Sequence, residues 1–169
     1  MRKNVMVIVT IISSVVIMTG VVIGALTLGG FGDDGVSDII FSEDKLEGTV
    51  EFREMLIHPG ETLYHKVLLK NKVEGECTIK INFDEHKPEF LANELQKYVY
   101  VTVTLGEGTI CENVLLSDLF TTELPETNCL LSDKDPLEMN ISFHMPEEIG
   151  NEAELTEAFF DVLINVSNE

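Results

Sequence analysis

Basic side chains are scarce in this 169-residue chain, which has 11 Lys and Arg against 30 Asp and Glu and a formal net charge of −19. A surface of that sign repels phosphate groups, so neither nucleic acid nor anionic lipid is expected as a partner. The acidity fits a solvated surface that keeps an exported protein soluble. Binding of divalent cations by surface carboxylates is the alternative, but the sequence has no D-x-[DN]-x-[DN]-G loop.

The sequence also lacks the short motifs of catalysis. It contains no H-E-x-x-H, no G-x-S-x-G and no P-loop. His58 and His65 are separated by Pro59-Gly60, which prevents a shared helical face, and residues seven apart on one strand point to opposite sides. We therefore expect no catalytic residues, no metal site, no cofactor and no small-molecule substrate.

Cysteine is rare as well, with Cys77, Cys111 and Cys129 and no C-x-x-C spacing that would indicate zinc. An odd number leaves one thiol over if any disulfide forms. Cys111 and Cys129 lie in loop-like sequence on either side of a short segment, so we predict that they form the pair. Cys77 begins a strand pattern on its apolar side and is predicted to be a small core residue.

Charge is absent from Val5 to Leu28, a run of 24 residues that follows Arg2 and Lys3. A helix of this length reaches about 36 Å, enough to cross the ~30 Å hydrocarbon core of a membrane. The basic residues before the run place the rest of the chain on the outer side. A retained anchor and a cleaved signal peptide both fit the run, since it is long for a signal but diluted by small residues near its end.

The remainder of the chain shows apolar residues at every second position, which is typical of half-buried strands. The segments with this pattern include residues 50–52, 63–69, 77–84, 99–105, 137–145 and 160–166. Alternating strands form antiparallel sheets with one wet face, and six or more of them predict two sheets packed face to face. Short helical insertions are expected at residues 88–97, 113–120 and 146–154.

Two N-glycosylation patterns fall within the predicted strands, at Asn140-Ile141-Ser142 and Asn165-Val166-Ser167. In both, the asparagine lies on the polar side of the alternation. Asn140 and Asn165 are therefore candidate glycosylation sites, provided that the organism has the machinery.

Three stretches of the chain together resemble a known family. They are the Pro-Gly-Glu turn of residues 57–63 with the strand that follows it to Asn71, the strand of residues 137–143, and the Pro-Glu-Glu-Ile-Gly-Asn-Glu-Ala stretch of residues 146–153. These stretches are similar to the corresponding parts of TasA/camelysin proteins. The resemblance covers about residues 36–168. It implies an exported, jelly-roll-like β-sandwich that builds extracellular fibres such as biofilm matrix filaments or pili.

The resemblance also implies assembly by donor-strand exchange, in which an N-terminal strand of one subunit completes a sheet of the next. The candidate donor is Asp33 to Leu46, with Val36, Ile39, Ile40 and Phe41 as its anchors. Such a head-to-tail contact does not close, so the expected partner is a homopolymer of the same chain. Removal of the apolar run would free this strand, which favours cleavage over retention and leaves only transient membrane contact.

The sequence is thus divided into a hydrophobic leader helix (residues 1–32), a donor-strand segment (33–48) and an all-β sandwich domain (49–169). The expected location is extracellular or at the cell surface, and membrane-anchored if the leader is retained. The main expectation is a non-catalytic filament subunit. A membrane-anchored surface domain that binds another protein is the alternative, and a camelysin-like metallopeptidase is disfavoured by the missing H-E-x-x-H.

Overall fold

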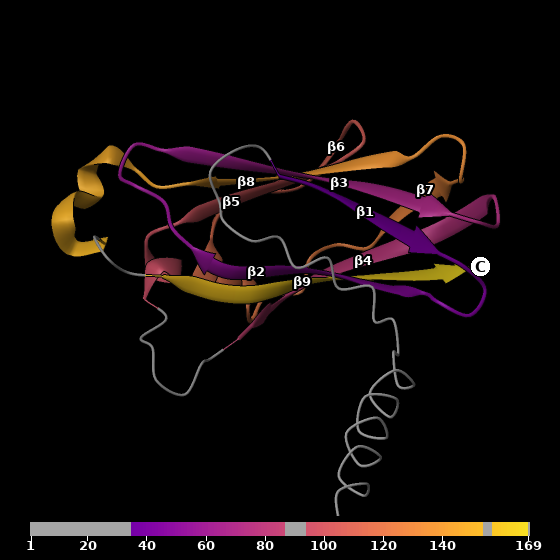
Figure 1. Ribbon diagram of the computed structural model, residues 1–169, viewed down its shortest axis with the longest axis horizontal. Coiled ribbons are helices and arrows are strands. Elements are labelled where there is room, and N and C mark those ends of the chain that lie inside the picture. The colour runs from indigo at the N-terminus through magenta and orange to yellow at the C-terminus, as the bar shows by residue number, and fades with distance from the viewer. Residues whose placement is uncertain (1–34, 87–93, 154–156, 169) are drawn as a thin grey trace, which may run out of the picture.

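The computed structural model describes residues 35–86, 94–153 and 157–168, which form two β-sheets packed face to face (Figure 1). The strands are β1 (Gly35–Phe41), β2 (Glu47–Met55), β3 (Thr62–Asn71), β4 (Gly75–Glu85), β5 (Tyr100–Leu105), β6 (Gly108–Leu115), β7 (Thr127–Leu131), β8 (Leu137–His144) and β9 (Ala158–Asn168). Helical turns are short: η1 (Leu95–Lys97), α1 (Leu116–Leu119) and η2 (Glu147–Ala153). The predicted all-β sandwich with few helices is confirmed.

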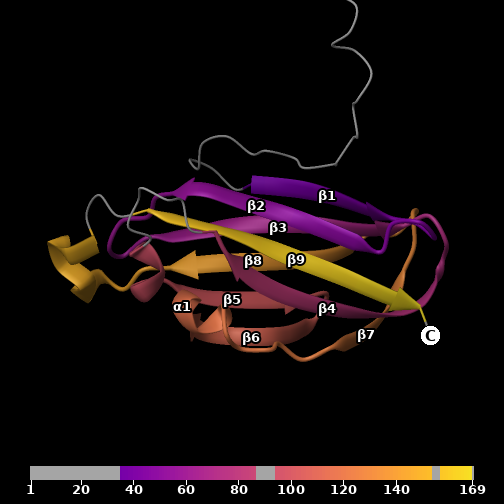
Figure 2. The same cartoon turned by 90° about the horizontal axis from the view of Figure 1, so that it is seen from below.

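The first sheet has the strand order β1-β3-β8-β5-β6, and the second has the order β2-β9-β4-β7. Figure 2 shows the strands of the two layers running roughly along the long axis of the domain. Every described pairing is antiparallel except that between β1 and β3. The chain therefore ends the first sheet with a parallel edge strand, which the alternation of its residues did not indicate.

The predicted alternation places the apolar side of each strand in the core. Val101, Val103 and Leu105 are buried, whereas Tyr100 and the threonines between them are half-buried on the outer side. In β3 the inward positions are Val67 and Leu69. Because side chains in a strand point alternately to opposite sides, one buried position fixes the orientation of the whole strand.

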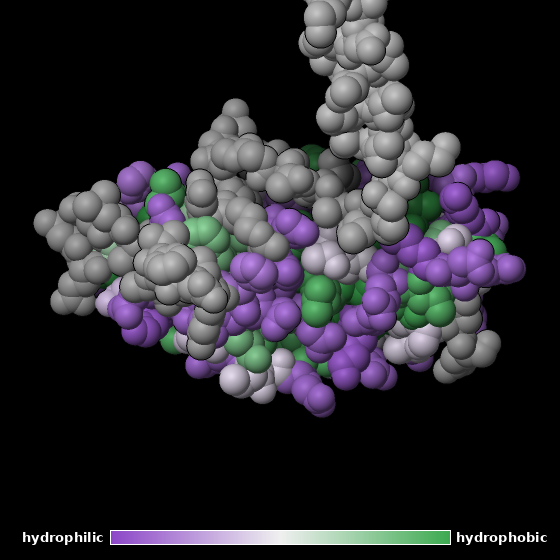
Figure 3. Space-filling model, turned by 60° about the horizontal axis from the view of Figure 1, so that its bottom comes forward, coloured by the Kyte–Doolittle hydropathy of each residue, from purple (hydrophilic) through white to green (hydrophobic). Residues whose placement is uncertain are grey.

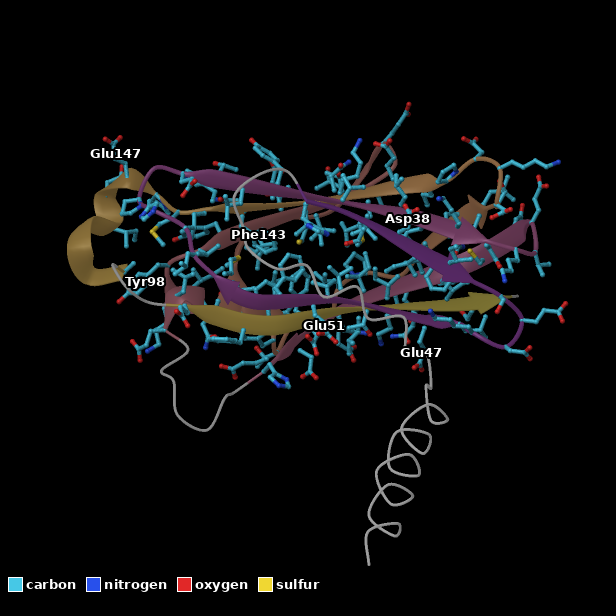
Figure 4. The ribbon with its side chains drawn as sticks, in the orientation of Figure 1. Asp38, Glu47, Glu51, Tyr98, Phe143 and Glu147 are labelled. Atoms are coloured by element: carbon cyan, nitrogen blue, oxygen red, sulfur yellow. The ribbon has the colours of Figure 1, made fainter. Side chains whose placement is uncertain are left out.

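Aromatic rings join the two sheets at the centre of the core. The ring of Phe52 on β2 stacks on that of Phe160 on β9, with centroids 4.7 Å apart and planes 7° apart. Phe143 on β8 meets Phe52 edge-on at 5.2 Å and thereby connects this pair to the first sheet. Figure 4 shows Phe143 in the space between the layers, whereas Glu147 lies at the periphery of the domain. Such pairs add attraction to the burial of apolar area.

Two strands were missed because their sequences are short or irregular. β6 was predicted to be partly helical at residues 113–115, but the strand continues to Leu115 and only Leu116–Leu119 is helical. Asn113 has a φ of 53°, and the pairing of β5 with β6 shifts register on either side of Val103. β7 has five residues, of which only Leu131 is fully buried. These features suppress the regular alternation that identifies a strand.

The leader segment at residues 1–32 lies outside the described residues, as does most of the helical turn expected at residues 88–97. Within the described ranges, no helix is long and apolar enough to cross a membrane. The predicted short helix at residues 146–154 corresponds to η2. The division of the chain at residues 32 and 48 stays a prediction, with β1 and the turn after it falling in the donor segment.

Replacing Phe52 by alanine should lower the free energy of unfolding by about 3–5 kcal/mol, because the cavity would open between both sheets. Urea unfolding followed by circular dichroism measures this loss. Leu56→Ala is the control, since the Leu56 side chain is 51% exposed and its loss should change stability by less than about 0.5 kcal/mol. Equal losses for the two variants would contradict the central role of the aromatic cluster.

Candidate functional site

The candidate site is the groove that holds β1 at the edge of the first sheet, between β3 and the neighbouring strand β2. β1 pairs with β3 in parallel over seven positions, from Gly35 opposite His65 to Phe41 opposite Asn71. No other described strand pairs with β1 in its sheet, and β2, which lies next to it, belongs to the second sheet. Figures 1 and 2 show β1 beside β3 at the margin of the layer. The predicted donor segment thus completes the first sheet of its own chain.

The four predicted anchors divide into two pairs with opposite orientations. Ile39 is 6% exposed and Phe41 is fully buried, so both belong to the core. Val36 and Ile40 are 55% and 42% exposed and face outward. Adjacent strand residues cannot both face inward, so Ile39 and Ile40 cannot serve the same side. The inward set consists of Ser37, Ile39 and Phe41.

A polar contact fixes the position of β1 on β3. The Ser37 hydroxyl lies 2.9 Å from Nε2 of His65, and both residues are buried. A Cβ added to Gly35 would come within 2.4 Å of the His65 imidazole, so glycine is required where β1 crosses the ring. The Nδ1 atom of His65 is buried without a hydrogen-bond partner. Burial lowers the pKa of His65 below its usual value, because the charged form would lose its hydration.

A second fixing point lies between β1 and β2. The side chain of Ile39 rests over Gly48, where an added Cβ would approach the Ile39 Cγ2 atom to 2.5 Å. The space remaining between the two strands is about 20 Å³, lined by Ser37 to Ile39 and by Lys45 and Gly48 to Val50. The missing side chain at Gly48 therefore forms a notch that Ile39 fills.

Contacts on the outer face of β1 and in the turn after it also hold β1 in place. Lys70 forms an ion pair of 3.0 Å with Asp38, and the Lys72 amide donates a hydrogen bond of 3.1 Å to the Phe41 carbonyl. Ser42 and Lys45 exchange two backbone hydrogen bonds of 3.0 Å across the turn that leads to β2. The ion pair is exposed, so it contributes little compared with the buried residues.

The predicted loop placement of Cys111 and Cys129 is wrong, whereas a disulfide between them stays a prediction. Cys111 lies in β6 of the first sheet, and Cys129 lies in β7 of the second, so neither is in a loop. The residue opposite Cys129 is Cys77 on β4, with their Sγ atoms 3.7 Å apart. Burial of Cys77 is confirmed, at 2% exposure. All three cysteines are free in this structure.

The candidate glycosylation sites lie on the outer sides of central strands. Asn140 on β8 stands between Lys66 and Thr104, and Asn165 on β9 stands between Glu47 and Lys80. Both side chains are half-buried. A glycan at either position would cover the middle of a sheet. Glycosylation itself stays a prediction.

Among the described residues, no group of three or more His, Cys, Asp or Glu side chains is arranged to hold a metal ion. His58 is exposed, whereas His65 is in the core, so the two histidines near Pro59-Gly60 are separated by burial as well as by direction. The face of the domain in Figure 3 carries mostly hydrophilic residues with apolar patches between them.

Comparison with known proteins identifies no family for this chain. No family model matches it, and no curated protein matches it. Among solved structures, the "CUB1-EGF-CUB2 domain of human MASP-1/3" aligns at 11% identity over 80% of this chain and 44% of that one, with a TM-score of 0.36. A β-glucosidase from Paenibacillus barengoltzii aligns at 11% identity over 85% of this chain and 12% of that one, with a TM-score of 0.31.

Replacing Gly48 by alanine should destabilise the protein by about 1–3 kcal/mol, because the added methyl group would collide with the branched Ile39 side chain. Gly75→Ala is the matched control, since nothing lies within 4 Å of the Cβ position there. Ile39→Ala should relieve the collision, so Gly48→Ala should lower the free energy of unfolding by less in an Ile39→Ala protein than in the wild type. A double-mutant cycle by urea unfolding measures the coupling, and additive losses would argue against the notch.

Stability should depend on His65 between about pH 7 and pH 5. The pKa of His65 is lowered in the folded protein, so the unfolded chain binds the proton more readily, and stability falls as the pH drops through about 6.5. Urea midpoints across this range should fall more for the wild type than for His65→Gln. His58→Gln, which changes an exposed histidine, should follow the wild type. Parallel curves for wild type and His65→Gln would contradict the coupling.

Proposed function

We propose that this protein is a non-catalytic structural subunit of an extracellular filament, in which β1 of one subunit occupies the groove of the next. The observation that carries the proposal is the edge position of β1, held on β3 by inward side chains from an N-terminal segment. In this proposal the sandwich is jelly-roll-like, and the partner is a second copy of the chain. No cofactor or small-molecule substrate takes part.

Exchange of β1 between copies would preserve its contacts. Ser37, Ile39 and Phe41 would meet the same residues of β3 and β2, whether these belong to the same chain or to another. The free energies of the closed monomer and the exchanged form then differ only through the turn and the entropy of association. Protein concentration therefore sets the equilibrium between monomers and exchanged copies. A one-directional exchange leaves an open groove at one end and a free strand at the other, which extends a filament.

The turn at residues 42–46 is the hinge in this scheme. It would open by losing the two hydrogen bonds between Ser42 and Lys45, which lie among exposed acidic neighbours. Five extended residues reach at most about 18 Å, so the donor's own sandwich would lie directly against the acceptor. Short hinges that change from a turn to an extended strand are a known route to strand exchange.

The resemblance to the TasA/camelysin family supports the same proposal. The Pro59-Gly60 turn joins β2 to β3, and Gly60 has a φ of 81°, a conformation that glycine adopts readily. The Pro-Glu-Glu-Ile-Gly-Asn-Glu-Ala stretch coincides with η2, directly before the last strand. The apolar run at residues 5–28 supports export to the cell surface, with its removal freeing β1.

A membrane-anchored surface domain is the second candidate function. It is favoured by the docking of β1 within its own chain, because a closed monomer with its first sheet complete needs no partner strand. In that case the apolar run would be retained, and the domain would bind another surface protein. The two functions differ in the fate of the N-terminus and in the state of β1.

Ile39→Asp should abolish filaments, whereas Ile40→Asp should leave them, because only Ile39 faces the groove. The whole chain would be expressed in a secreting bacterial host, and material sheared from the cells would be examined by electron microscopy. The two variants differ by one position in the same strand, so they share charge and location. Equal filament yields for the two would mean that β1 is not the strand exchanged.

N-terminal sequencing of the same material separates the two candidate functions. Filaments whose subunits begin between residues 25 and 33 would support the proposal. An intact Met1 confined to the membrane fraction, together with monomers at high concentration, would overturn it in favour of the anchored domain.

A further inference from the structure

A pair of facing thiols joins the edge strand β7 to β4. Cys77 and Cys129 are directly opposite in the antiparallel register, and their Sγ atoms are 3.7 Å apart. Opposed residues of an antiparallel pair have Cβ atoms about 4.5–5.5 Å apart, close to the range found in disulfides. A bond of about 2.05 Å needs the sulfurs to approach further, which rotation of the side chains supplies. The facing pair is therefore close to bonding distance.

We propose that Cys77 and Cys129 form a disulfide under oxidising conditions, making this pair a redox modification site that fastens β7 to the second sheet. Cys111 would remain the free thiol, since it lies on β6 of the other sheet. This assignment does not depend on filament assembly, because it rests on the β4–β7 pairing alone.

The exposure of the two cysteines determines which of them reacts first. A depression of about 310 Å³ borders both cysteines and is lined by Glu76 to Thr78 and by Asn128 to Leu130. Cys129 is partly exposed, whereas Cys77 is 2% exposed. A small disulfide reagent such as oxidised glutathione therefore reaches Cys129 first. Cys77 then resolves the mixed disulfide.

The chemistry balances with such a reagent as oxidant. The Cys129 thiolate attacks one sulfur of the reagent and releases one reagent thiol. The Cys77 thiolate attacks the Cys129 sulfur and releases the second. The protein loses two protons and two electrons, and the reagent's sulfur–sulfur bond becomes two thiols.

Reaction should be slow, because both cysteines are held as thiols at neutral pH. Burial raises the pKa of Cys77, and it raises the pKa of Cys129 to about 12, with the neighbouring Cys77 as a further cause. Thiolate is the reacting form, so the rate should rise with pH.

The bond would matter most for β7, because that strand is short and has only β4 beside it among the described strands. Five register pairs hold it, from Gly75 opposite Leu131 to Ile79 opposite Thr127. Cys77 and Cys129 are 52 positions apart in the chain, so the bond would also close a long loop and restrict the unfolded state.

The test uses the full chain incubated with oxidised glutathione at pH 8.5, followed by maleimide labelling in denaturant and mass spectrometry. The expected result is one labelled thiol per chain, a cross-linked peptide containing Cys77 and Cys129, and a melting temperature raised by roughly 10 °C. Three labelled thiols after prolonged oxidation, or a cross-link that includes Cys111, would overturn the proposal.

Variants keep the result interpretable. Cys111→Ser should give the same cross-link and no labelled thiol. Cys77→Ala and Cys129→Ala should each lose the rise in melting temperature. Cys77→Ala should stop at the mixed disulfide between Cys129 and glutathione, which leaves Cys111 as its labelled thiol, whereas Cys129→Ala should retain two labelled thiols. The peptide map of the wild type decides the matter even if one of these variants folds poorly.

Discussion

The contact of Phe52 with Phe160, Phe143 and His65 is the interaction on which the rest of the structure depends. Phe52 stacks on Phe160 within the second sheet and meets Phe143 and His65 of the first sheet edge-on, the latter at a centroid distance of 5.3 Å. Packing this tight leaves little freedom to slide one sheet over the other. It also fixes the imidazole against which β1 docks. The His65 imidazole therefore belongs both to the core and to the β1 groove.

This sharing explains why a polar residue is tolerated in the core. His65 is 1% exposed, and its Nε2 atom is satisfied by Ser37 of β1. In the proposed exchange, water would reach the imidazole while the groove is vacant. A strand without serine at the matching position would then bury Nε2 without a partner, which is costly, so refilling would favour a strand that carries serine there. The histidine thus gives the groove a preference for its own sequence.

The sequence predicted the parts of the fold that have a local signature. Strands β4, β5 and β8 alternate between buried and more exposed positions over most of their length, as does β3 from His65 and β9 from Phe160, because one side lies in the core and the other faces outward. β7 escaped prediction because it is short and lies at a sheet edge, where burial does not enforce alternation. The same gap hid that Cys129 lies opposite Cys77. Which cysteines meet depends on the register of β4 against β7, and strand register between distant segments leaves no trace in local sequence.

The candidate site was predicted in location but not in detail. The apolar residues of the segment around Ile39 marked it as a strand, but the sequence could not show that its parallel neighbour is β3 of the same chain. Nor could it separate Ile39 from Ile40, because the phase of a short strand depends on the surface that receives it. Gly48 illustrates this limit, since its importance comes from Ile39, nine positions earlier in the chain.

The central place of β9 has a consequence for how the chain acquires its structure. β9 lies between β2 and β4, and it pairs Asn165 with Glu47, more than a hundred residues earlier. Pairings between such distant segments make folding slow, because long loops must close before the contacts form. The second sheet cannot assemble until residues 158–168 have been synthesised and are free. The core of a chain with this strand order can close only when its last strand is available, and β2 and β4 lack their shared partner until then.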